Sequence, residues 1–317
     1  MIPSIDLNDF VNGNEEQKHA FVSELGKAFN EIGFVAVKNH GLTSELSDEL
    51  YKAYQKFFAL PQEIKSKYEI PNGAGQRGYT GKGKETAKGF KTPDLKEFYH
   101  TGQENKPKEA ELSIHYPDNV WPVEIPELST ISIKTFKILE QAGIQLLRAI
   151  ALYLHLESDY FDEKVATGNS ILRAIHYFPI ENPTFEKEEA VRAAAHEDIN
   201  LITLLMGASA DGLQIQKKDG SWVAVTALPD QIVVNVGDML ARLTNDILKS
   251  TTHRVVNPPK ELMHLPRYSM PFFMHPRADM DLTCLPQCIK IENPKHYTDM
   301  TAGEFLDERL RELGLKK

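Results

Sequence analysis

The segment that decides the fold runs from His196 to Ser269 and carries four motifs: His196-Glu197-Asp198, Asn235-Val-Gly-Asp238, His253-Arg254-Val255-Val256 and Arg267-Tyr268-Ser269. In a strand, side chains two residues apart point to the same face, so His196 and Asp198 at the start of one expected strand can bind one ion side by side. His253 begins another expected strand and adds a second imidazole. Two imidazoles and one carboxylate fill one triangular face of a metal's coordination sphere and leave the opposite positions open. The segment therefore predicts a metal site that suits iron(II), although manganese, cobalt or nickel would also bind.

Arg267 and Ser269 form a second pattern, because they lie two residues apart on the strand that follows His253. A guanidinium and a hydroxyl on one strand face can receive a carboxylate, which the guanidinium binds through two parallel hydrogen bonds. A metal site with a carboxylate receptor beside it is what a keto acid needs. One end of the acid would chelate the metal, and the arginine would hold the other.

The bulk composition narrows the class of protein. The chain has 317 residues, a formal net charge of −9 and a pI of about 5.7, a balance that does not favour a duplex-binding surface. Its two cysteines, Cys284 and Cys288, do not make a disulfide framework or a zinc site, and we expect reduced thiols. No signal peptide is expected at the N-terminus, and no apolar run approaches the ~20 residues of a membrane span. We therefore expect a cytoplasmic monomer with no nucleic-acid or membrane partner.

The periodicity of apolar residues changes between the two halves of the chain. A helical period predicts helices at 15–32, 43–60, 62–68, 127–156 and 301–313. Strands are expected at 2–7, 34–37 and 95–100 in the first half. In the second half a period of two predicts strands at 170–178, 199–205, 213–217, 222–224, 232–236, 239–243, 253–256 and 268–273. Short strands at this spacing indicate a sandwich or barrel, so the fold class is α+β and mainly β.

Residues 71–96 form a glycine- and lysine-rich segment without an apolar period. The phosphate-binding spacing is absent, because Gly83-Lys84 is followed by Glu85. Long loops in compact domains are usually functional or disordered, so we interpret this segment as a flap over an active site.

Together these motifs resemble the iron(II)/2-oxoglutarate-dependent dioxygenases of the isopenicillin N synthase-like superfamily. The N-terminal half is also similar to that family, in Ile2-Pro-Ser-Ile-Asp-Leu7, Gly33-Phe-Val-Ala-Val-Lys-Asn-His-Gly41 and Phe57-Phe58-Ala-Leu-Pro61. The resemblance implies a double-stranded β-helix (jelly-roll, cupin-like) core with N-terminal and supporting helices. It implies one catalytic unit over 1–317. Within that unit, the N-terminal region would be 1–115, the helical support 116–169, the core 170–277 and a C-terminal extension with a helix 278–317.

The resemblance also implies the ligands and the chemistry. Iron(II) would be held by His196, Asp198 and His253, and 2-oxoglutarate by Arg267 and Ser269. The segment Leu172-Arg-Ala-Ile-His-Tyr-Phe-Pro179 is similar to a family strand whose second tyrosine often touches the cosubstrate, which here is Tyr177. The implied reaction oxidises a small organic substrate, with 2-oxoglutarate and O2 converted to succinate and CO2.

The substrate is not readable from these motifs. Glu97, Arg173 and Phe273 are the candidates for substrate contacts, with Arg242 behind them. If Glu97 and Arg173 both face the iron, a zwitterionic or polar small molecule is favoured. Three alternatives stay open: an oxidase of the same fold that does not use 2-oxoglutarate and performs ring closure or ethylene formation, a metal-holding jelly roll without turnover, and, less favoured, a zinc hydrolase.

Overall fold

Two β-sheets packed face to face form the centre of the fold. The computed structural model describes residues 2–71, 73–84, 96–109, 116–179, 191–206, 212–225, 228 and 230–316. Strands of the larger sheet follow the order β1-β2-β10-β7-β12-β5-β4-β3, and those of the smaller sheet follow β6-β11-β8-β9. A cluster of buried side chains, including Phe34, Phe98, Ile175, Leu213 and Val255, combines residues of both sheets. The two inner faces therefore share one core.

The strands of the second half alternate between the two sheets, except that β8 and β9 are neighbours in the smaller sheet. The larger sheet takes β5 (Ile171–Tyr177), β7 (Ile202–Met206), β10 (Ile232–Val236) and β12 (Arg267–Met274). The smaller sheet takes β6 (Val191–His196), β8 (Leu213–Gln216), β9 (Trp222–Ala224) and β11 (His253–Val256). Strands from the N-terminal half extend the larger sheet at both edges: β1 (Ser4–Asp6) and β2 (Phe34–Lys38) at one, β3 (Gly78–Thr80) and β4 (Lys96–Gly102) at the other.

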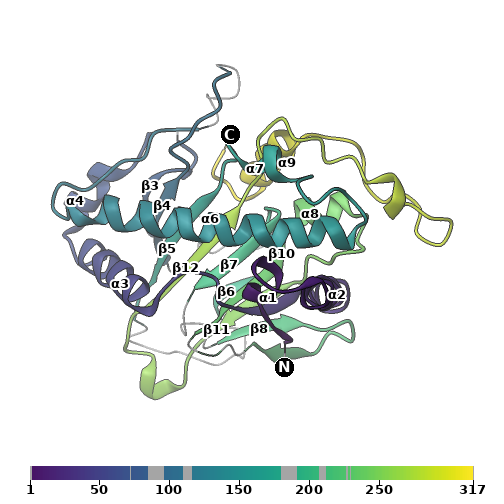
Figure 1. Cartoon of the computed structure of the whole chain (residues 1–317). Coiled ribbons are helices and arrows are strands. Elements are labelled where there is room, and N and C mark those ends of the chain that lie inside the picture. Colours follow the sequence, from purple (N-terminus) through teal and green to yellow (C-terminus); the bar gives the residue numbers. More distant parts are fainter. Residues whose placement is uncertain are drawn as a thin grey trace.

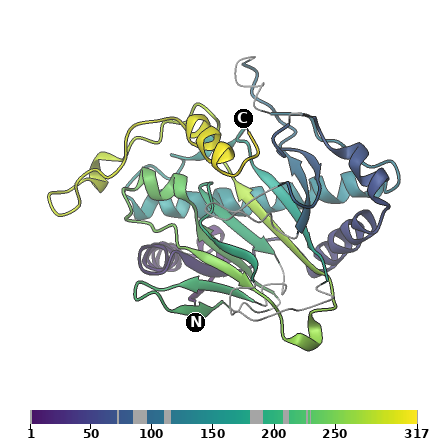
Figure 2. The same ribbon diagram turned by 180° about the vertical axis from the view of Figure 1, so that it is seen from behind.

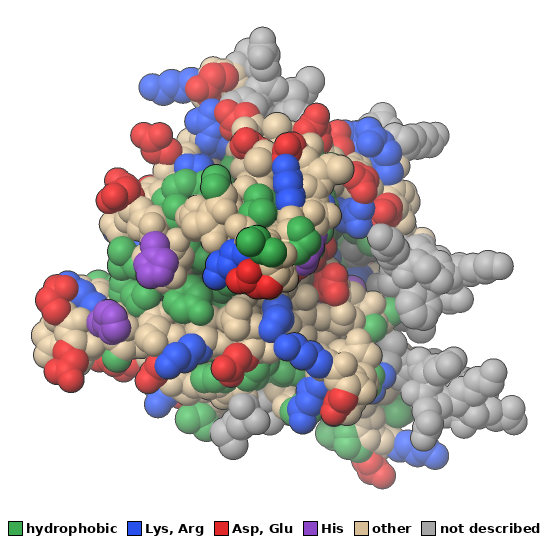
Figure 3. All heavy atoms as spheres, turned by 90° about the vertical axis from the view of Figure 1, so that its right-hand side faces the viewer, with side chains coloured by type: hydrophobic (Ala, Val, Ile, Leu, Met, Phe, Trp, Pro, Cys, Tyr) green, Lys and Arg blue, Asp and Glu red, His purple; other side chains and the backbone are tan. Residues whose placement is uncertain are grey.

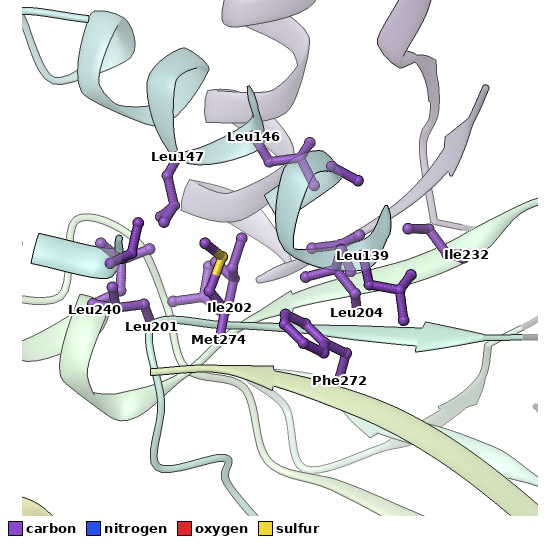
Figure 4. Close-up of a cluster of buried hydrophobic side chains, with 14 of the residues drawn as sticks. Leu139, Leu146, Leu147, Leu201, Ile202, Leu204, Ile232, Leu240, Phe272 and Met274 are labelled. Carbon is purple, nitrogen blue, oxygen red and sulfur yellow. The ribbon is translucent and has the colours of Figure 1, made fainter. Parts of the chain in front are cut away.

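The helix α6 (Glu127–Tyr153) covers the outer face of the larger sheet, in front of it in Figure 1 and behind it in Figure 2. Leucines of α6 meet side chains of β7 and β12, among them Leu204, Phe272 and Met274 (Figure 4). Burying a side chain of this size contributes about 1.5–3 kcal/mol. This second core fixes the larger sheet from behind, so its inner face can carry polar groups.

The remaining helices surround this core. They are α1 (Leu7–Val11), α2 (Glu15–Glu31), α3 (Ser44–Phe58), α4 (Gln62–Lys65), α7 (Asp162–Val165), α8 (Asp238–Leu243) and α9 (Ala302–Glu312), with short 3-10 turns at Ser66–Tyr68, Lys260–Leu262 and Pro286–Cys288. Asn14 and Thr301 begin α2 and α9 with capping boxes, in which the side chain accepts from the third backbone N–H of the helix. In the part of the chain that the structure describes, no helix is long and apolar enough to cross a membrane.

One expected element differs from the structure, two further elements were not expected, and the expected flap is described only in part. Residues 239–243 form the helix α8 rather than a strand, because Gly237 provides an extended N-cap and the run Met-Leu-Ala-Arg-Leu buries residues on successive helical turns. The strand β6 and the short helix α1 were not expected. Of the expected flap, residues 71, 73–84 and 96 are described, and residues 72 and 85–95 lie outside the described residues.

Charged side chains of both signs are interspersed over the face shown in Figure 3. On this face, acids and bases are mixed and neither sign forms a large patch. Such a mixture keeps a protein dispersed without creating a large field of one sign.

Candidate metal centre

The three predicted metal ligands converge at one end of the smaller sheet. His196 and His253 are register partners on β6 and β11, so pairing of the strands brings the imidazoles together. Each Nε2 lies close to Oδ1 of Asp198, at 3.9 Å from His196 and 3.8 Å from His253. All three ligand atoms lie within 4.8 Å of one another. The pair His196 and Asp198 was expected at the start of a strand, whereas it lies where β6 ends.

Backbone carbonyls hold both imidazoles in the orientation that a metal requires. Nδ1 of His196 lies 2.7 Å from the carbonyl oxygen of Ala194, and Nδ1 of His253 lies 3.1 Å from that of Thr251. A hydrogen bond to a carbonyl places the proton on Nδ1 and leaves the Nε2 lone pair for a metal. Desolvation and the neighbouring His253 lower the pKa of His196 to about 4, so this imidazole is neutral at pH 7.

The two oxygens of Asp198 have different partners. Oδ2 accepts hydrogen bonds from the Thr203 hydroxyl at 2.6 Å and from the Asn235 amide at 2.8 Å. Oδ1 is the oxygen that faces both imidazoles. Desolvation opposes ionisation of Asp198, but the two histidines and these hydrogen bonds outweigh it and lower its pKa. Asp198 is therefore a carboxylate with one oxygen held by the protein and one directed at the metal position.

The motif Asn235-Val-Gly-Asp238 holds Asp198 from two directions. Asn235 lies near the end of β10 and donates to the side chain, while the backbone N–H of Asp238 donates to the Asp198 carbonyl at 2.7 Å. Gly237 lies so close to Asn200 that a Cβ would be 2.2 Å from its carbonyl oxygen. The glycine is thus required by close approach of two backbones.

The predicted carboxylate receptor lies on the inner face of the larger sheet. Arg267 and Tyr177 are register partners, with the guanidinium carbon 5.2 Å from the tyrosine ring centroid. Ser269 is buried two residues along β12, opposite Ile175. Burial and the nearby Arg267 lower the pKa of Arg192 on β6. The structure therefore brings Arg267, Ser269 and Tyr177 onto one face and adds Arg192, for which the sequence carries no motif.

A cavity of about 400 Å³ adjoins the predicted metal ligands. Some of the candidate substrate-binding residues line this cavity and others do not. Arg173 and Phe273 line this cavity together with His196 and Asp198. Arg242 instead packs over Tyr297 and Phe305 beside the C-terminal helix.

Glu97 lies on the opposite face of β4 from the cavity-lining Lys96 and His100. It is fully buried, and its carboxylate contacts Lys65 at 2.7 Å, Tyr79 at 2.5 Å and His176 at 2.7 Å. The expected contact of Glu97 with substrate is thus replaced by a buried charge cluster. The sequence could have indicated this placement, because side chains alternate along a strand. Lys96, Phe98 and His100 share one face of β4, so Glu97 points to the other.

The C-terminal helix was not expected at this site. The cavity is closed on one side by α9 and the residues after it, which include Leu306, Leu310 and Leu313. The sequence of α9 predicts an amphipathic helix. It does not predict the surface against which the apolar side of that helix packs, because this depends on the tertiary structure.

The donor set fits a first-row divalent metal. Two imidazoles and one carboxylate, with open positions opposite them, are the facial triad of non-haem iron(II) oxygenases. Metal-binding side chains are normally oriented by hydrogen bonds from their remaining polar atoms. Here the two Nδ1 atoms are hydrogen-bonded to backbone carbonyls, and Oδ2 of Asp198 accepts two hydrogen bonds.

Comparisons with known proteins agree with this geometry. Residues 2–124 match the model of the non-haem dioxygenase N-terminal region described from morphine synthesis, and residues 168–276 match that of the 2OG-Fe(II) oxygenase superfamily. The 2-oxoglutarate-Fe(II) type oxidoreductase hxnY of Emericella nidulans is 30% identical, over 99% of this chain and 92% of that protein.

Two solved structures extend the likeness to the whole fold. A 2OG-Fe(II) oxygenase family protein from Caulobacter crescentus is 42% identical with a TM-score of 0.87, covering 98% of both chains. A full-length Neurospora crassa protein, solved in complex with alpha-KG and thymine, is 32% identical with a TM-score of 0.86, covering 98% of this chain and 96% of that one. These relatives support an enzyme that uses iron(II) and 2-oxoglutarate over an oxidase that does without 2-oxoglutarate. The chain belongs to the iron(II)- and 2-oxoglutarate-dependent dioxygenases of the isopenicillin N synthase-like superfamily.

Proposed function

We propose that His196, Asp198 and His253 hold iron(II), and that Arg267, Ser269 and Tyr177 receive 2-oxoglutarate. The observation that supports this assignment best is the convergence of two Nε2 atoms and Oδ1 within 4.8 Å, with both Nδ1 atoms and Oδ2 engaged elsewhere. When bound, the metal and cosubstrate supply the oxidising chemistry, in which 2-oxoglutarate and O2 give succinate and CO2 while a small organic substrate is oxidised. We propose hydroxylation as the outcome for that substrate.

The residues of the chain then have separable roles. Asp198 offsets part of the metal charge, and Thr203 and Asn235 keep its second oxygen away from the metal. Arg267 would receive the distal carboxylate of 2-oxoglutarate, and the Ser269 hydroxyl would donate to the same group. The wall formed by α9 and Phe273 would exclude water from the oxidising position.

We also propose that the core is a double-stranded β-helix and that the chain acts as one catalytic unit. Strands β5 to β12 form two four-stranded layers, β10-β7-β12-β5 and β6-β11-β8-β9, and the chain changes layer after each strand except between β8 and β9, which supports a jelly roll. The N-terminal strands β2 and β4 are hydrogen-bonded directly to β10 and β5, which supports a single unit.

Anaerobic titration tests the ligand assignment. Addition of 2-oxoglutarate to the iron(II) protein is expected to produce a visible charge-transfer band, because the keto acid chelates the metal. The Asp198→Ala variant should lose the band. In the Arg267→Gln variant, the band should appear only at a higher 2-oxoglutarate concentration. A band that is unchanged in both variants would contradict the assignment.

Thymine is the first substrate to test, because the related Neurospora crassa structure contains it. Succinate formed in parallel with oxidised thymine would place pyrimidine bases among the substrates. Succinate formed without oxidised thymine would show 2-oxoglutarate turnover that is uncoupled from this base.

A further inference from the structure

A second cavity, of about 440 Å³, lies beside the hairpin that joins β8 and β9. The end of α2 and the segment that precedes His253 also line it, through Glu31, Ile32, Lys249 and Thr251. Among the described residues, it shares no lining residue with the cavity at the predicted metal ligands. It is therefore a separate space, for which the proposed oxidation has no use.

The inner part of this cavity is apolar. Ile2 and Ile215 are buried in the core that the two sheets share, and Ile32 and Val223 pack against the same core. All four side chains line the cavity. A space of this volume with an apolar lining and a few charged groups is typical of a small-molecule site, and it suits a ring or a short alkyl chain.

Three lysines line the same cavity, namely Lys217, Lys218 and Lys249. Lys217 and Lys218 are exposed, which places them at the mouth, and Lys249 is half-buried. Burial and the charge of Lys218 lower the pKa of Lys249, because an ammonium group disfavours a second positive charge close to it. An anion between these two ammonium groups would relieve their repulsion.

Two acids, Glu31 and Asp219, also line the cavity. Glu31 acts on Lys249 in the opposite direction, but burial and Lys218 outweigh it. Asp219 accepts hydrogen bonds from the backbone N–H and the hydroxyl of Ser221, at 2.9 and 2.6 Å. Three lysines and two acids leave one positive charge (3 − 2 = 1) in a chain whose net charge is −9. A ligand with a single negative charge complements this cavity.

The wall of the cavity is connected to a predicted metal ligand. The Thr251 hydroxyl donates to the Ile32 carbonyl at 2.7 Å, and the Thr251 carbonyl oxygen lies 3.1 Å from Nδ1 of His253. The backbone N–H of Lys249 donates to the Phe29 carbonyl at 3.0 Å. The segment 249–251 is thus attached to the end of α2 on one side, and it orients His253 on the other.

We propose that this cavity is an effector site for a small amphipathic monocarboxylate, whose carboxylate lies between Lys218 and Lys249 and whose ring or short alkyl chain packs on the apolar lining. A bound carboxylate removes the repulsion between the two ammonium groups and holds the segment 249–251 against α2. Through the Thr251 carbonyl, it thereby keeps His253 in the orientation that a metal needs. Metal binding is therefore tighter when the site is occupied. This coupling rests on the proposed function, because it takes His253 as a metal ligand.

Calorimetry with matched probes tests binding at this cavity. The full chain is loaded with Mn(II) and 2-oxoglutarate, so that the proposed metal centre is occupied, and is titrated with 4-phenylbutyrate or its uncharged amide, 4-phenylbutyramide. The acid should bind about tenfold or more tightly than the amide, because hydrogen bonds from ammonium to carboxylate are stronger than those to a neutral amide. The double variant Lys218→Gln, Lys249→Gln should reduce this preference to less than about threefold.

Two further variants locate the ligand. Ala224→Trp places a large side chain at an exposed lining position and should weaken binding of both probes. Lys134→Gln is the matched control, because Lys134 is an exposed lysine of α6 that does not line the cavity, and it should keep the full preference for the acid. Equal binding of acid and amide, a preference that survives in the double lysine variant, or failure of the acid to bind at millimolar concentration would each overturn the inference. Loss of acid binding when Mn(II) and 2-oxoglutarate are added would place the acid in the other cavity and overturn it as well.

Mn(II) titration followed by electron paramagnetic resonance tests the coupling. Saturating 4-phenylbutyrate should tighten Mn(II) binding about fivefold, and it should have no effect in the double lysine variant. An unchanged Mn(II) affinity in the unaltered chain, or equal tightening in the variant, would overturn the effector role. If Mn(II) binds His253→Ala as tightly as the unaltered chain, the proposed function fails. Calorimetry without metal still shows in that case whether the cavity binds the acid.

Discussion

Single atoms of Asp198 determine how the metal centre is organised. Oδ2 receives the Thr203 hydroxyl and the Asn235 amide, and Oδ1 is left toward the two imidazoles. A carboxylate without these donors could rotate or bind a metal through either oxygen. Outer contacts of this kind usually change metal affinity by 10- to 100-fold when they are lost.

Thr203→Val should therefore weaken metal binding by roughly 10- to 100-fold while it preserves the shape of the side chain. Mn(II) titration followed by electron paramagnetic resonance measures the change. Thr244→Val is the control, because Thr244 is also buried but bonds to the Leu240 carbonyl of the adjoining helix. Equal Mn(II) affinity in the two variants would show that Thr203 does not orient Asp198.

Glu97 belongs to a buried cluster whose role is stability. Its carboxylate has three donors, Lys65, Tyr79 and His176, and the Lys65 and Glu97 side chains are only 6% and 0% exposed. His176 in turn stacks on Tyr268 at a centroid distance of 4.9 Å. The cluster ties α4 and β3 to the strands that carry Tyr177 and Arg267.

Glu97→Gln should destabilise the fold by about 3–5 kcal/mol at pH 7, because it leaves the Lys65 ammonium buried without its counter-charge. Urea denaturation measures this loss. The double variant Lys65→Met, Glu97→Gln should be less destabilised than Glu97→Gln alone. Glu127→Gln, which breaks the exposed pair of Glu127 with Lys56, is the control and should change stability little. Equal effects of Glu97→Gln and Glu127→Gln would contradict a structural role for the cluster.

The stability of the unaltered chain and that of Glu97→Gln should also depend differently on pH. Desolvation raises the pKa of Glu97, but hydrogen bonds from His176, Lys65 and Tyr79 outweigh it and lower the pKa below the ordinary 4.5. A carboxyl whose folded pKa is lowered stabilises the fold above its unfolded pKa and loses that contribution as pH falls through the folded value. The stability difference between the two proteins should thus be full at pH 7 and shrink below pH 4.5. A difference that stays constant on acidification would show that Glu97 does not ionise in this way.

At the scale of elements, the turn between β10 and α8 connects the sheet to the metal ligand. Gly237 has a φ of −106°, which any residue can adopt, so its requirement is space rather than backbone freedom. The carbonyl of Asn200 occupies the place of a Cβ, and the N–H of Asp238 bonds to Asp198 beside it.

Gly237→Ala should destabilise the protein by about 1–3 kcal/mol, because the added methyl group forces two backbones apart. It should also weaken Mn(II) binding, since Asp198 is displaced with Asn200. Gly81→Ala is the control: its Cβ would lie 3.2 Å from Oε1 of the Glu69 side chain, which can move. Thermal denaturation and Mn(II) titration of both variants give the comparison, and unaltered metal affinity in Gly237→Ala would separate the turn from the metal centre.

At the scale of the molecule, the metal centre depends on parts of the chain far apart in sequence. The smaller sheet supplies both imidazoles, β7 and β10 of the larger sheet support Asp198 through Thr203 and Asn235, and α9 closes the cavity. Ligands that bind only this assembled site must stabilise the whole fold.

Mn(II) and 2-oxoglutarate together should raise the Tm by several degrees, since a ligand at 100 times its Kd contributes about 2.7 kcal/mol. Differential scanning fluorimetry measures the shift. 2-Oxoglutarate alone should have a smaller effect than with metal, because the keto acid chelates the ion. Asp198→Ala should abolish the metal-dependent part of the shift. A shift of equal size in that variant would place the metal elsewhere.

The sequence by itself predicted the residues that we propose as metal ligands and as keto-acid receptor, and it predicted most elements of the fold. His196, Asp198 and Arg267 stand in local patterns, and local periodicity marks the long helices and strands, because both depend on spacings of a few residues. The helix at 239–243 escaped prediction, since a short apolar run suits a buried helix as well as a strand.

Only the tertiary structure decided which groups surround the cavity. Whether Glu97 or Lys96 faces the metal depends on the register of β4 against β5, and a shift of one residue exchanges the two faces. The position of α9 over the cavity and the stacking of Arg173 between Phe98 and Phe273 join residues from distant parts of the chain. No local spacing encodes such contacts, because they arise when packed elements bring separate faces together.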